Sequence, residues 1–449
     1  MPDLDLLLRG GTVVTEKAFH PMDVGVGNGK VVALGPDLSA TARTEINAAD
    51  LHIFPGVIDA HVHFNEPGRT DWEGIETGSR AFAAGGGTLF FDMPLNAHPP
   101  TIDAEAFDLK LAAARKNSFT DFALWGGLVS QDGGQLEELA ARGVVGFKAF
   151  MCDSGIGDFP AVNEAELREG MKRAAQLNLP VAVHAESESL TQDLAREKMT
   201  GGRTSIRDYL DSRPIAAELE AIRRALDLAG ETGCALHVVH VSSGEGIALI
   251  AEAKRRGADV SCETCPHYLL LTEADMEQLG AVAKCAPPLR TTVEQLNLWQ
   301  RVLAGEVTTV GSDHSPSPPG MKLDRDFFKV WGGISSVQHT LSLLLSRSGP
   351  GDEALPLLAG LLAANVARRF KIPAKGRMEV GFDADFALVD LRRDFQVCAK
   401  DLLFRHRQSP YIGRTLRGRV VRTILRGQTI FLDDKMVAKP AGCLVKPAS

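Results

Sequence analysis

The feature that most constrains this chain is the alternation of short apolar runs with amphipathic helical patterns through its middle. Two of the helical patterns are NEAELREGMKRAAQLN (163–178) and AAELEAIRRALDLAGETG (216–233), the second ending at Gly230 or Gly233. Near-continuous apolar strands separated by helices predict a parallel sheet that is buried on both faces. The eight runs expected to form strands are residues 54–63, 88–94, 121–127, 145–150, 181–186, 236–242, 259–269 and 308–314.

Eight such units predict an α/β fold, a (β/α)₈ barrel over residues 54–375, with its functional side chains at the C-terminal ends of the strands. A doubly wound open sheet is the alternative, but no G-x-G-x-x-G pattern follows the first strand. The two ends of the chain, 1–53 and 376–449, carry short β-like runs, and Asn28-Gly29 is a hairpin turn signal. Because neither end is large enough to bury a core alone, we expect them to pair into one small β-sandwich module.

Charge and cysteine content exclude several classes of partner and location. The net charge of −8 argues against nucleic acid or an anionic membrane as the main partner. The N-terminus has acids where a signal peptide has bases, and no run approaches the roughly 20 apolar residues of a membrane span. Seven scattered cysteines fit a reducing cytoplasm. Cys262 and Cys265 form a CxxC without a second pair, so we expect them to be buried as small apolar side chains rather than to bind zinc.

Titratable side chains close several of the expected strands. Alternate residues of a strand point to the same face, so the two histidines of DAHVHFNEPG (59–68) would face one direction. One such residue is more often a hydrogen-bonded core residue, but six at one rim of a barrel are hard to assign to packing. Four imidazoles and a carboxylate suit a divalent metal such as zinc, with cobalt, iron or manganese as alternatives. The six residues are His61, His63, Lys148, His184, His240 and Asp313.

Lys148 is the unusual member of this set, because a protonated amine has no lone pair to offer a metal. It could form an ion pair at the barrel rim with Glu186 or Asp313. Alternatively, it could react with CO₂ to give a carbamate, an anion with two oxygens that is able to bridge two metal ions. The residues alone leave both interpretations open.

The complete set resembles the cyclic-amidohydrolase branch of the amidohydrolase superfamily, over essentially the whole chain. The resemblance implies two divalent metal ions, with Asp313 joining the histidines of the first strand on one ion. His184 and His240 would bind the other ion, and a hydroxide and N6-carboxylated Lys148 would bridge the two. Asp313 would then act as general acid and base, passing a proton from the hydroxide to the leaving ring nitrogen. Relatives are commonly homotetramers, so we expect a homotetramer.

Within this branch, five segments resemble the allantoinases. This implies hydrolysis of the ring amide of allantoin, a neutral hydantoin with a ureido group, to allantoate in purine catabolism. A hydantoinase or dihydropyrimidinase is the alternative enzyme, and a non-catalytic scaffold is the alternative of another class, disfavoured because all six ligand positions are filled. The segments are FNEPGRTDWEG (64–74), DMPLNAHPPT (92–101), FKAFMCDSGIGDFP (147–160), FKVWGGISSVQ (328–338) and HRQSPYIG (406–413).

Two contrasts with sister families bear on the substrate. Dihydroorotases usually place an arginine where this chain has Asn65, and a neutral amide cannot grip a substrate carboxylate in the same way. Hydantoinases carry a tyrosine that donates to the developing oxyanion where this chain has Asp153. Ser154 could replace that donor, the metal could suffice without it, or residues 153–155 could form a plain turn.

The remaining expectations concern backbone groups and histidines around the site. Backbone groups near Cys285 are expected to hold the amide edge of the ring, with the thiol packed. Gly332 and Gly333 would expose their backbone to a ureido-bearing ligand, or form a tight turn or hinge. Together with Asn65 and Ser154, these three complete the expected substrate-binding set. Among other histidines, His267 and His314 could support the ligands, whereas His237, an odd number of residues from His240, is expected to face the helices.

Overall fold

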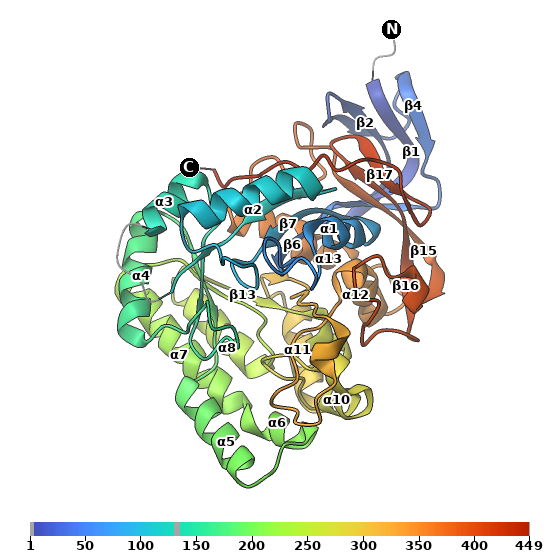
Figure 1. Cartoon of the computed structure of the whole chain (residues 1–449). Coiled ribbons are helices and arrows are strands. Elements are labelled where there is room, and N and C mark those ends of the chain that lie inside the picture. The colour runs from blue at the N-terminus through green and yellow to red at the C-terminus, as the bar shows by residue number, and fades with distance from the viewer. Residues whose placement is uncertain (1–3, 130–134, 449) are drawn as a thin grey trace.

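The computed structural model describes residues 4–129 and 135–448, and its larger part is the predicted parallel barrel (Figure 1). Two parallel sheets, of the orders β6-β7-β8 and β14-β13-β12-β11-β10-β9, form its wall. A parallel bridge between Val62 and His314 joins the first sheet to the end of the second. The barrel strands are β6 (Val57–Val62), β7 (Gly87–Asp92), β8 (Asp121–Leu124), β9 (Gly126–Gly127), β10 (Phe147–Phe150), β11 (Val181–His184), β12 (Leu236–Val238), β13 (Val260–Thr264) and β14 (Thr309–Val310).

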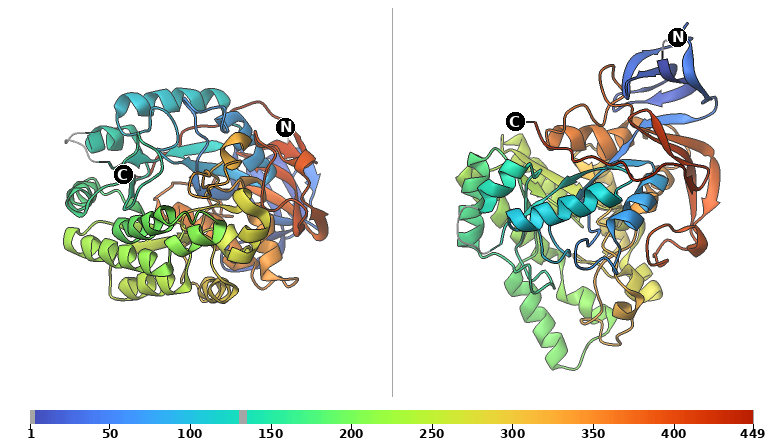
Figure 2. Two further views of the ribbon diagram at one scale, coloured as in Figure 1. Left: turned by 60° about the horizontal axis from the view of Figure 1, so that its bottom comes forward. Right: turned by 45° about the horizontal axis from the view of Figure 1, so that its top comes forward.

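Helices surround the barrel, as the turned views make clear (Figure 2). Asn163 and Glu166 form a reciprocal capping box at the start of α4, and Gly233, in the left-handed conformation, ends α7. No helix among the described residues is long and apolar enough to cross a membrane. The helices are α1 (Ile75–Ala84), α2 (Ala104–Asn117), α3 (Gln135–Arg142), α4 (Glu164–Gln176), α5 (Glu188–Thr200), α6 (Ile206–Ser212), α7 (Ile215–Thr232), α8 (Gly244–Arg255), α9 (Pro266–Leu270), α10 (Glu273–Leu279), α11 (Thr292–Leu303), α12 (Thr340–Ser348), α13 (Leu355–Ala359) and α14 (Asn365–Arg369).

Two local expectations about the barrel are wrong. The run 259–269 is a strand only as far as Thr264, because Pro266 begins the short helix α9. His237 faces the barrel interior: it packs against Phe370, with ring centroids 5.2 Å apart, and hydrogen-bonds Ser261 at 2.8 Å. The prediction assumed that residues 237–240 continue one strand with alternating side chains. However, β12 ends at Val238, and the chain then turns through a positive φ at His240.

The two ends of the chain pair into one nine-stranded sheet beside the barrel (Figure 1). β5 runs antiparallel to β15 and parallel to β1, so the N- and C-terminal segments interleave. Asn28 and Gly29, both with positive φ, form the predicted hairpin turn between β2 and β3. The strands are β1 (Leu4–Val14), β2 (Phe19–Gly27), β3 (Lys30–Gly35), β4 (Ala42–Asn47), β5 (His52–Pro55), β15 (Phe386–Gln396), β16 (Thr415–Leu425), β17 (Gln428–Leu432) and β18 (Lys435–Met436).

Contacts between the small sheet and the barrel are continuous. The expected boundary between residues 53 and 54 lies inside β5, and β6 begins two residues after β5 ends. The chain beyond β18 returns to the barrel, where Val445 N–H donates to the carbonyl of Phe122 at 2.8 Å. The last residues therefore pair with barrel strand β8 rather than with the sheet of the chain ends.

Candidate active site

The six predicted side chains meet at the C-terminal end of the barrel. His61 Nε2 and His63 Nε2 lie 3.3 and 3.4 Å from the same oxygen, Oδ1 of Asp313. His184 Nδ1 lies 3.0 Å from His240 Nε2. All five side chains are buried, and they come from β6, β11 and the segments that follow β12 and β14. Two groups of potential ligand atoms therefore face each other across the barrel mouth.

In three of the imidazoles, the ring nitrogen that points away from the centre contacts an oxygen of a neighbouring residue. His61 Nδ1 contacts Glu263 Oε1 at 2.8 Å, and His63 Nδ1 contacts the carbonyl of Leu95 at 3.0 Å. His184 Nε2 contacts Glu186 Oε2 at 2.8 Å. Such contacts set the ring orientation and the tautomer, which leaves the other nitrogen directed to the centre. Burial alone would raise the pKa of Glu263, but its two neighbouring histidines lower it to about 2, so this carboxylate is charged.

Lys148 lies on β10 with its amine buried and without a hydrogen-bond partner among the described residues. Of its two proposed ion-pair partners, Glu186 pairs with Arg213 instead, and Asp313 contacts the histidines. Burial lowers the pKa of Lys148 to about 7, because a desolvated ammonium is disfavoured. An orphaned and partly neutral amine beside imidazole and carboxylate donors fits a carbamylated lysine in a divalent metal centre.

Asp59 ties the backbone of the first ligands to that of the last. Its carboxylate accepts from the N–H groups of His61 and Ser312, each at 3.1 Å, and thereby connects β6 with the residue before Asp313. Asp313 and His240 have positive φ values of 44° and 40°. A non-glycine residue adopts this conformation only where its surroundings impose it, as they commonly do at functional sites.

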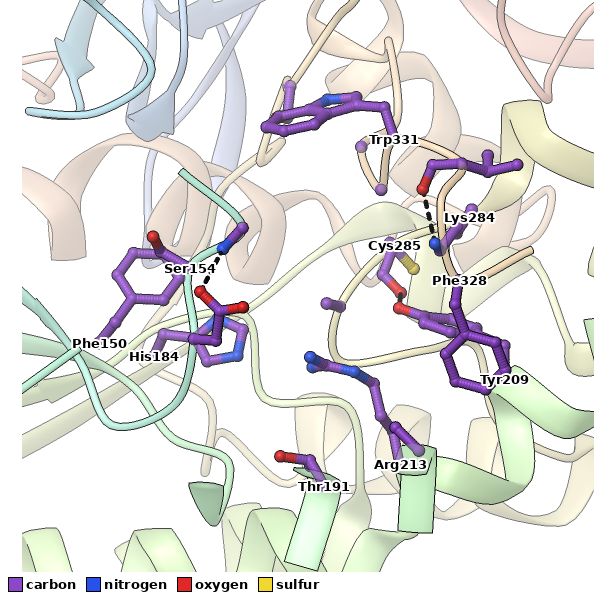
Figure 3. A pocket seen from close by; sticks show the side chains of 18 of the residues that line it. Phe150, Ser154, His184, Thr191, Tyr209, Arg213, Lys284, Cys285, Phe328 and Trp331 are labelled. Carbon is purple, nitrogen blue, oxygen red and sulfur yellow. Dashed lines mark hydrogen bonds between the residues drawn. The ribbon is translucent and has the colours of Figure 1, made fainter. Parts of the chain in front are cut away.

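A cavity of about 550 Å³ opens directly onto these side chains. The candidate ligands His61, His63, His184, His240 and Asp313 form its floor. Tyr209 and Arg213 from the end of α6, with Lys284, Cys285, Phe328 and Trp331, form the opposite wall (Figure 3). The cavity is thus bounded by strand ends at its floor and by loops together with helices α5 and α6 around it.

Of the expected substrate-binding residues, Asn65 does not line this cavity. It is buried, and its amide nitrogen lies 3.4 Å from the carbonyl of Pro316. Ser154 lines the cavity, but its hydroxyl donates to the carbonyl of Phe159 at 2.5 Å. Asp153 Oδ1 accepts from Gly155 N–H at 3.0 Å, so residues 153–155 do form a turn.

Cys285 and the two glycines line the opposite wall. The carbonyl of Cys285 accepts from the Tyr209 hydroxyl at 2.9 Å, and burial raises the pKa of its thiol to about 12. A Cβ on Gly333 would lie 2.2 Å from the carbonyl oxygen of Ser315, so glycine is required there by backbone contact. A Cβ on Gly332 would make only ordinary van der Waals contact, with Lys284 Cε at 3.9 Å, so a side chain would fit there.

Comparison with known proteins agrees with this geometry. The amidohydrolase family model matches residues 52–430. The chain belongs to the amidohydrolase family. An allantoinase of Rubrobacter xylanophilus is 57% identical over 448 residues, covering 100% of this chain and 98% of the relative. An allantoinase of Solibacter usitatus is 52% identical, covering 99% of this chain and 97% of the relative. The solved L-hydantoinase (dihydropyrimidinase) from Arthrobacter aurescens has a TM-score of 0.95 and 34% identity, covering 99% of this chain and 100% of that one.

These comparisons confirm the family, the fold class and the enzyme class that the sequence predicted. The amidohydrolase family is metal-dependent, and the cluster of His61, His63 and Asp313 provides ligand atoms within 4.8 Å of one another. Cys152, His184 and Glu186 form a second cluster, whose potential ligand atoms also lie within 4.8 Å of one another.

Sequence reasoning missed several residues of this amidohydrolase site. Arg213 donates to Glu186 and thereby extends the support behind His184. Lys284 is 4% exposed, and Tyr209 is also buried in the cavity wall. A basic residue after a helix has no distinctive sequence signal, so Arg213 could not be recognised. Lys284 precedes Cys285 in the segment KCAPPLR, which was the one available signal.

Other residues singled out from the sequence have structural surroundings. His314 Nδ1 accepts from Ser336 N–H at 3.1 Å and helps to anchor the loop after β14. His267 is buried against Tyr268, with ring centroids 4.2 Å apart. Cys262 and Cys265 are free thiols packed in the apolar core, as predicted.

Proposed function

We propose that this amidohydrolase opens the hydantoin ring of allantoin to give allantoate. The observation that carries the proposal is identity of 57% and 52% to allantoinases over essentially the whole chain. Convergence of the six strand-end side chains supports it, because a scaffold without activity would not need them. The sequence identity over the whole chain therefore supports the choice of substrate, and the side chains at the barrel mouth support the type of reaction.

We assign the candidate ligands to two divalent ions, in two sets. His61, His63 and Asp313 would hold one ion, and His184 with His240 the other, while carboxylated Lys148 would contact both. Imidazole and carboxylate ligands suit zinc first, with cobalt, manganese or iron also compatible. Bound ions would lower the pKa of a water molecule and polarise the ring carbonyl.

The residues of the chain supply proton transfer and orientation. Asp313 lies at the cavity floor with its Oδ1 toward the strand-end imidazoles, so it can accept a proton from the attacking water. The same carboxyl group can then deliver that proton to the leaving ring nitrogen. Glu263 and Glu186 fix the ring orientation of His61 and His184 during both steps.

The cavity wall is compatible with a neutral, polar ring. Asn65 keeps its amide out of the cavity, and the Ser154 hydroxyl and the Cys285 carbonyl each have a partner inside the protein. Arg213, which also lines the cavity, has Glu186 as its partner, so its charge is offset. A hydantoinase or dihydropyrimidinase is the second candidate, favoured by the TM-score of 0.95 to a solved hydantoinase.

A substrate panel tests the proposal. Purified protein, analysed for metal in the same sample, is assayed with allantoin, hydantoin, dihydrouracil and dihydroorotate. We expect allantoin to have the highest kcat/KM by a wide margin. A protein that opens hydantoin or dihydrouracil far better than allantoin contradicts the assignment and supports the second candidate.

We also propose a homotetramer working in the cytoplasm. The family resemblance supports the tetramer, and the seven cysteines, all unpaired, support a reducing location. Light scattering coupled to size-exclusion chromatography measures the assembly directly, and a monomeric mass contradicts the tetramer.

A further inference from the structure

Two lysines, the buried Lys284 and the half-buried Lys322, support the loop wall of the cavity without forming an ion pair with any described carboxylate. Lys322 directs its ammonium to the carbonyls of Ala281, Trp331 and Gly333, at 3.0, 2.9 and 2.8 Å. An ammonium has three N–H donors, and all three are used here. This one side chain therefore fixes the positions of two carbonyls in the loop relative to the segment before Lys284.

Lys284 supports the same loop from the other side. Its ammonium donates to the carbonyls of Phe327 and Val330, both at 2.6 Å, and lies 4.3 Å from the centre of the Tyr209 ring. Its own carbonyl accepts from Gly333 N–H at 2.8 Å. Burying an ammonium is costly unless every donor is satisfied, and a methionine would fill the space without that cost. What a lysine adds is directed bonds to carbonyl groups.

Gly332 is the residue of this loop whose N–H and C=O both lack a hydrogen-bond partner among the described residues. The backbone groups beside it are engaged: Trp331 N–H donates to the carbonyl of Met321, and the carbonyls of Trp331 and Gly333 are bound by Lys322. Gly332 lines the cavity, where the nearest atom to an added Cβ would be Lys284 Cε at 3.9 Å.

We infer that Lys284 and Lys322 are positioning residues that hold the loop 327–333 so that the free N–H and C=O of Gly332 meet the amide edge of the substrate ring. The backbone of one residue offers one N–H donor and one C=O acceptor, which complement the adjacent C=O and N–H of a cyclic ureide. Lys322 has no donor left for the ring, and Lys284 directs two of its three donors to carbonyls of the loop. The inference rests on the proposed function for the class of substrate and on the loop geometry for the role of the lysines.

The test removes the donors while keeping an unbranched side chain of similar size. Lys322→Met and Lys284→Met are compared with Lys172→Met, a control on α4, outside the cavity, whose side chain is 52% exposed. Steady-state kinetics with allantoin, metal content and thermal midpoint are measured on the full-length, metal-loaded protein. We expect Lys322→Met and Lys284→Met each to raise KM about tenfold, the effect of 1.4 kcal/mol of binding, with kcat and metal content unchanged. The control is expected to behave as wild type.

Two results would overturn the inference. One is a KM in both Lys284→Met and Lys322→Met equal to that of Lys172→Met. The other is a fall in kcat and metal content without a change in KM, which would place the lysines in support of the metal centre. If wild type opens another ring of the panel instead of allantoin, the proposed function fails, and the same comparison is made with that ring.

A measurement on the wild-type protein covers the case in which the variants do not fold. Amide hydrogen exchange followed by NMR in the ligand-free protein should show slow exchange at Trp331 and Gly333 and fast exchange at Gly332. Fast exchange at all three amides would mean that the loop is not held, and slow exchange at Gly332 would mean that its N–H is not available. Either result contradicts the inference.

Discussion

The two walls of the cavity are built by different means. On the floor, His61, Lys148 and His184 are carried by barrel strands, and their backbones are fixed by the sheet. On the opposite wall, the loop 327–333 has no regular secondary structure and is held by Lys284 and Lys322. On our proposals, the strand ends would carry out the reaction, and the loop would select the ring. Damage to the floor should therefore act on metal content and kcat, and damage to the loop on KM.

Replacing Lys148 tests the floor most severely. Lys148→Ala removes the group proposed to contact both ions, so we expect loss of bound metal and a fall in kcat on the order of 10³-fold, since several kcal/mol of catalysis comes from the metal. Activity and metal content are measured with and without added short-chain carboxylic acids, which should partly restore both. Lys172→Ala, with its side chain 52% exposed, is the control. Full metal content and wild-type rate in Lys148→Ala would refute the proposed role.

Glu263→Gln weakens the floor without removing a ligand. The amide can no longer accept a charge-assisted hydrogen bond from His61, so metal affinity and kcat should fall 10- to 100-fold, roughly the usual effect of such partners. KM for allantoin should stay within about twofold, because Glu263 lies outside the loop wall. Metal titration and steady-state kinetics separate the two effects, and Glu252→Gln on the surface is the control. A rise in KM with normal metal affinity would contradict the expected separation between metal binding at the floor and substrate binding at the loop.

The rate at which the metal-free protein regains activity with added metal and bicarbonate should depend on pH. Burial lowers the pKa of Lys148 to about 7, so its reactive neutral form increases as pH rises. The neutral fraction grows about fivefold between one pH unit below the pKa and the pKa itself. The rate of reactivation by metal and bicarbonate should therefore rise about fivefold from pH 6 to pH 7 and level off above about pH 8. A rate that is flat over this range, or that is still rising steeply at pH 9, disagrees with the buried amine.

Cys285→Ala should have the smallest effect. The thiol is buried and protonated, and only the backbone of this residue is expected to meet the ring. We expect kcat/KM for allantoin to remain within about threefold of wild type, with a small loss of stability from the lost packing. Kinetics and thermal unfolding measure both quantities. A loss of more than tenfold in kcat/KM at full metal content would assign the thiol itself to the loop wall.

Local sequence patterns predicted the barrel and its candidate ligands. Apolar runs separated by helical patterns predicted the strands, and the polar residues that end them proved to meet at one rim. This worked because strand alternation and helix caps depend on near neighbours, as at His61 and His63 or at Asn163. The rule of alternating strand residues failed for His237, because β12 ends at Val238, before His240.

The loop wall was decided only by tertiary structure. Lys284 reaches carbonyls 43 and 46 positions away, and Lys322 reaches one 41 positions back. Asn65 looked like a substrate contact from its place after His63, but its amide is directed to Pro316, 251 residues further along the chain. Gly332 and Gly333 are indistinguishable in sequence, and only their surroundings show that one is required by a close backbone contact and the other is open to a ligand. Contacts between residues so far apart follow from the closed barrel and have no local signal.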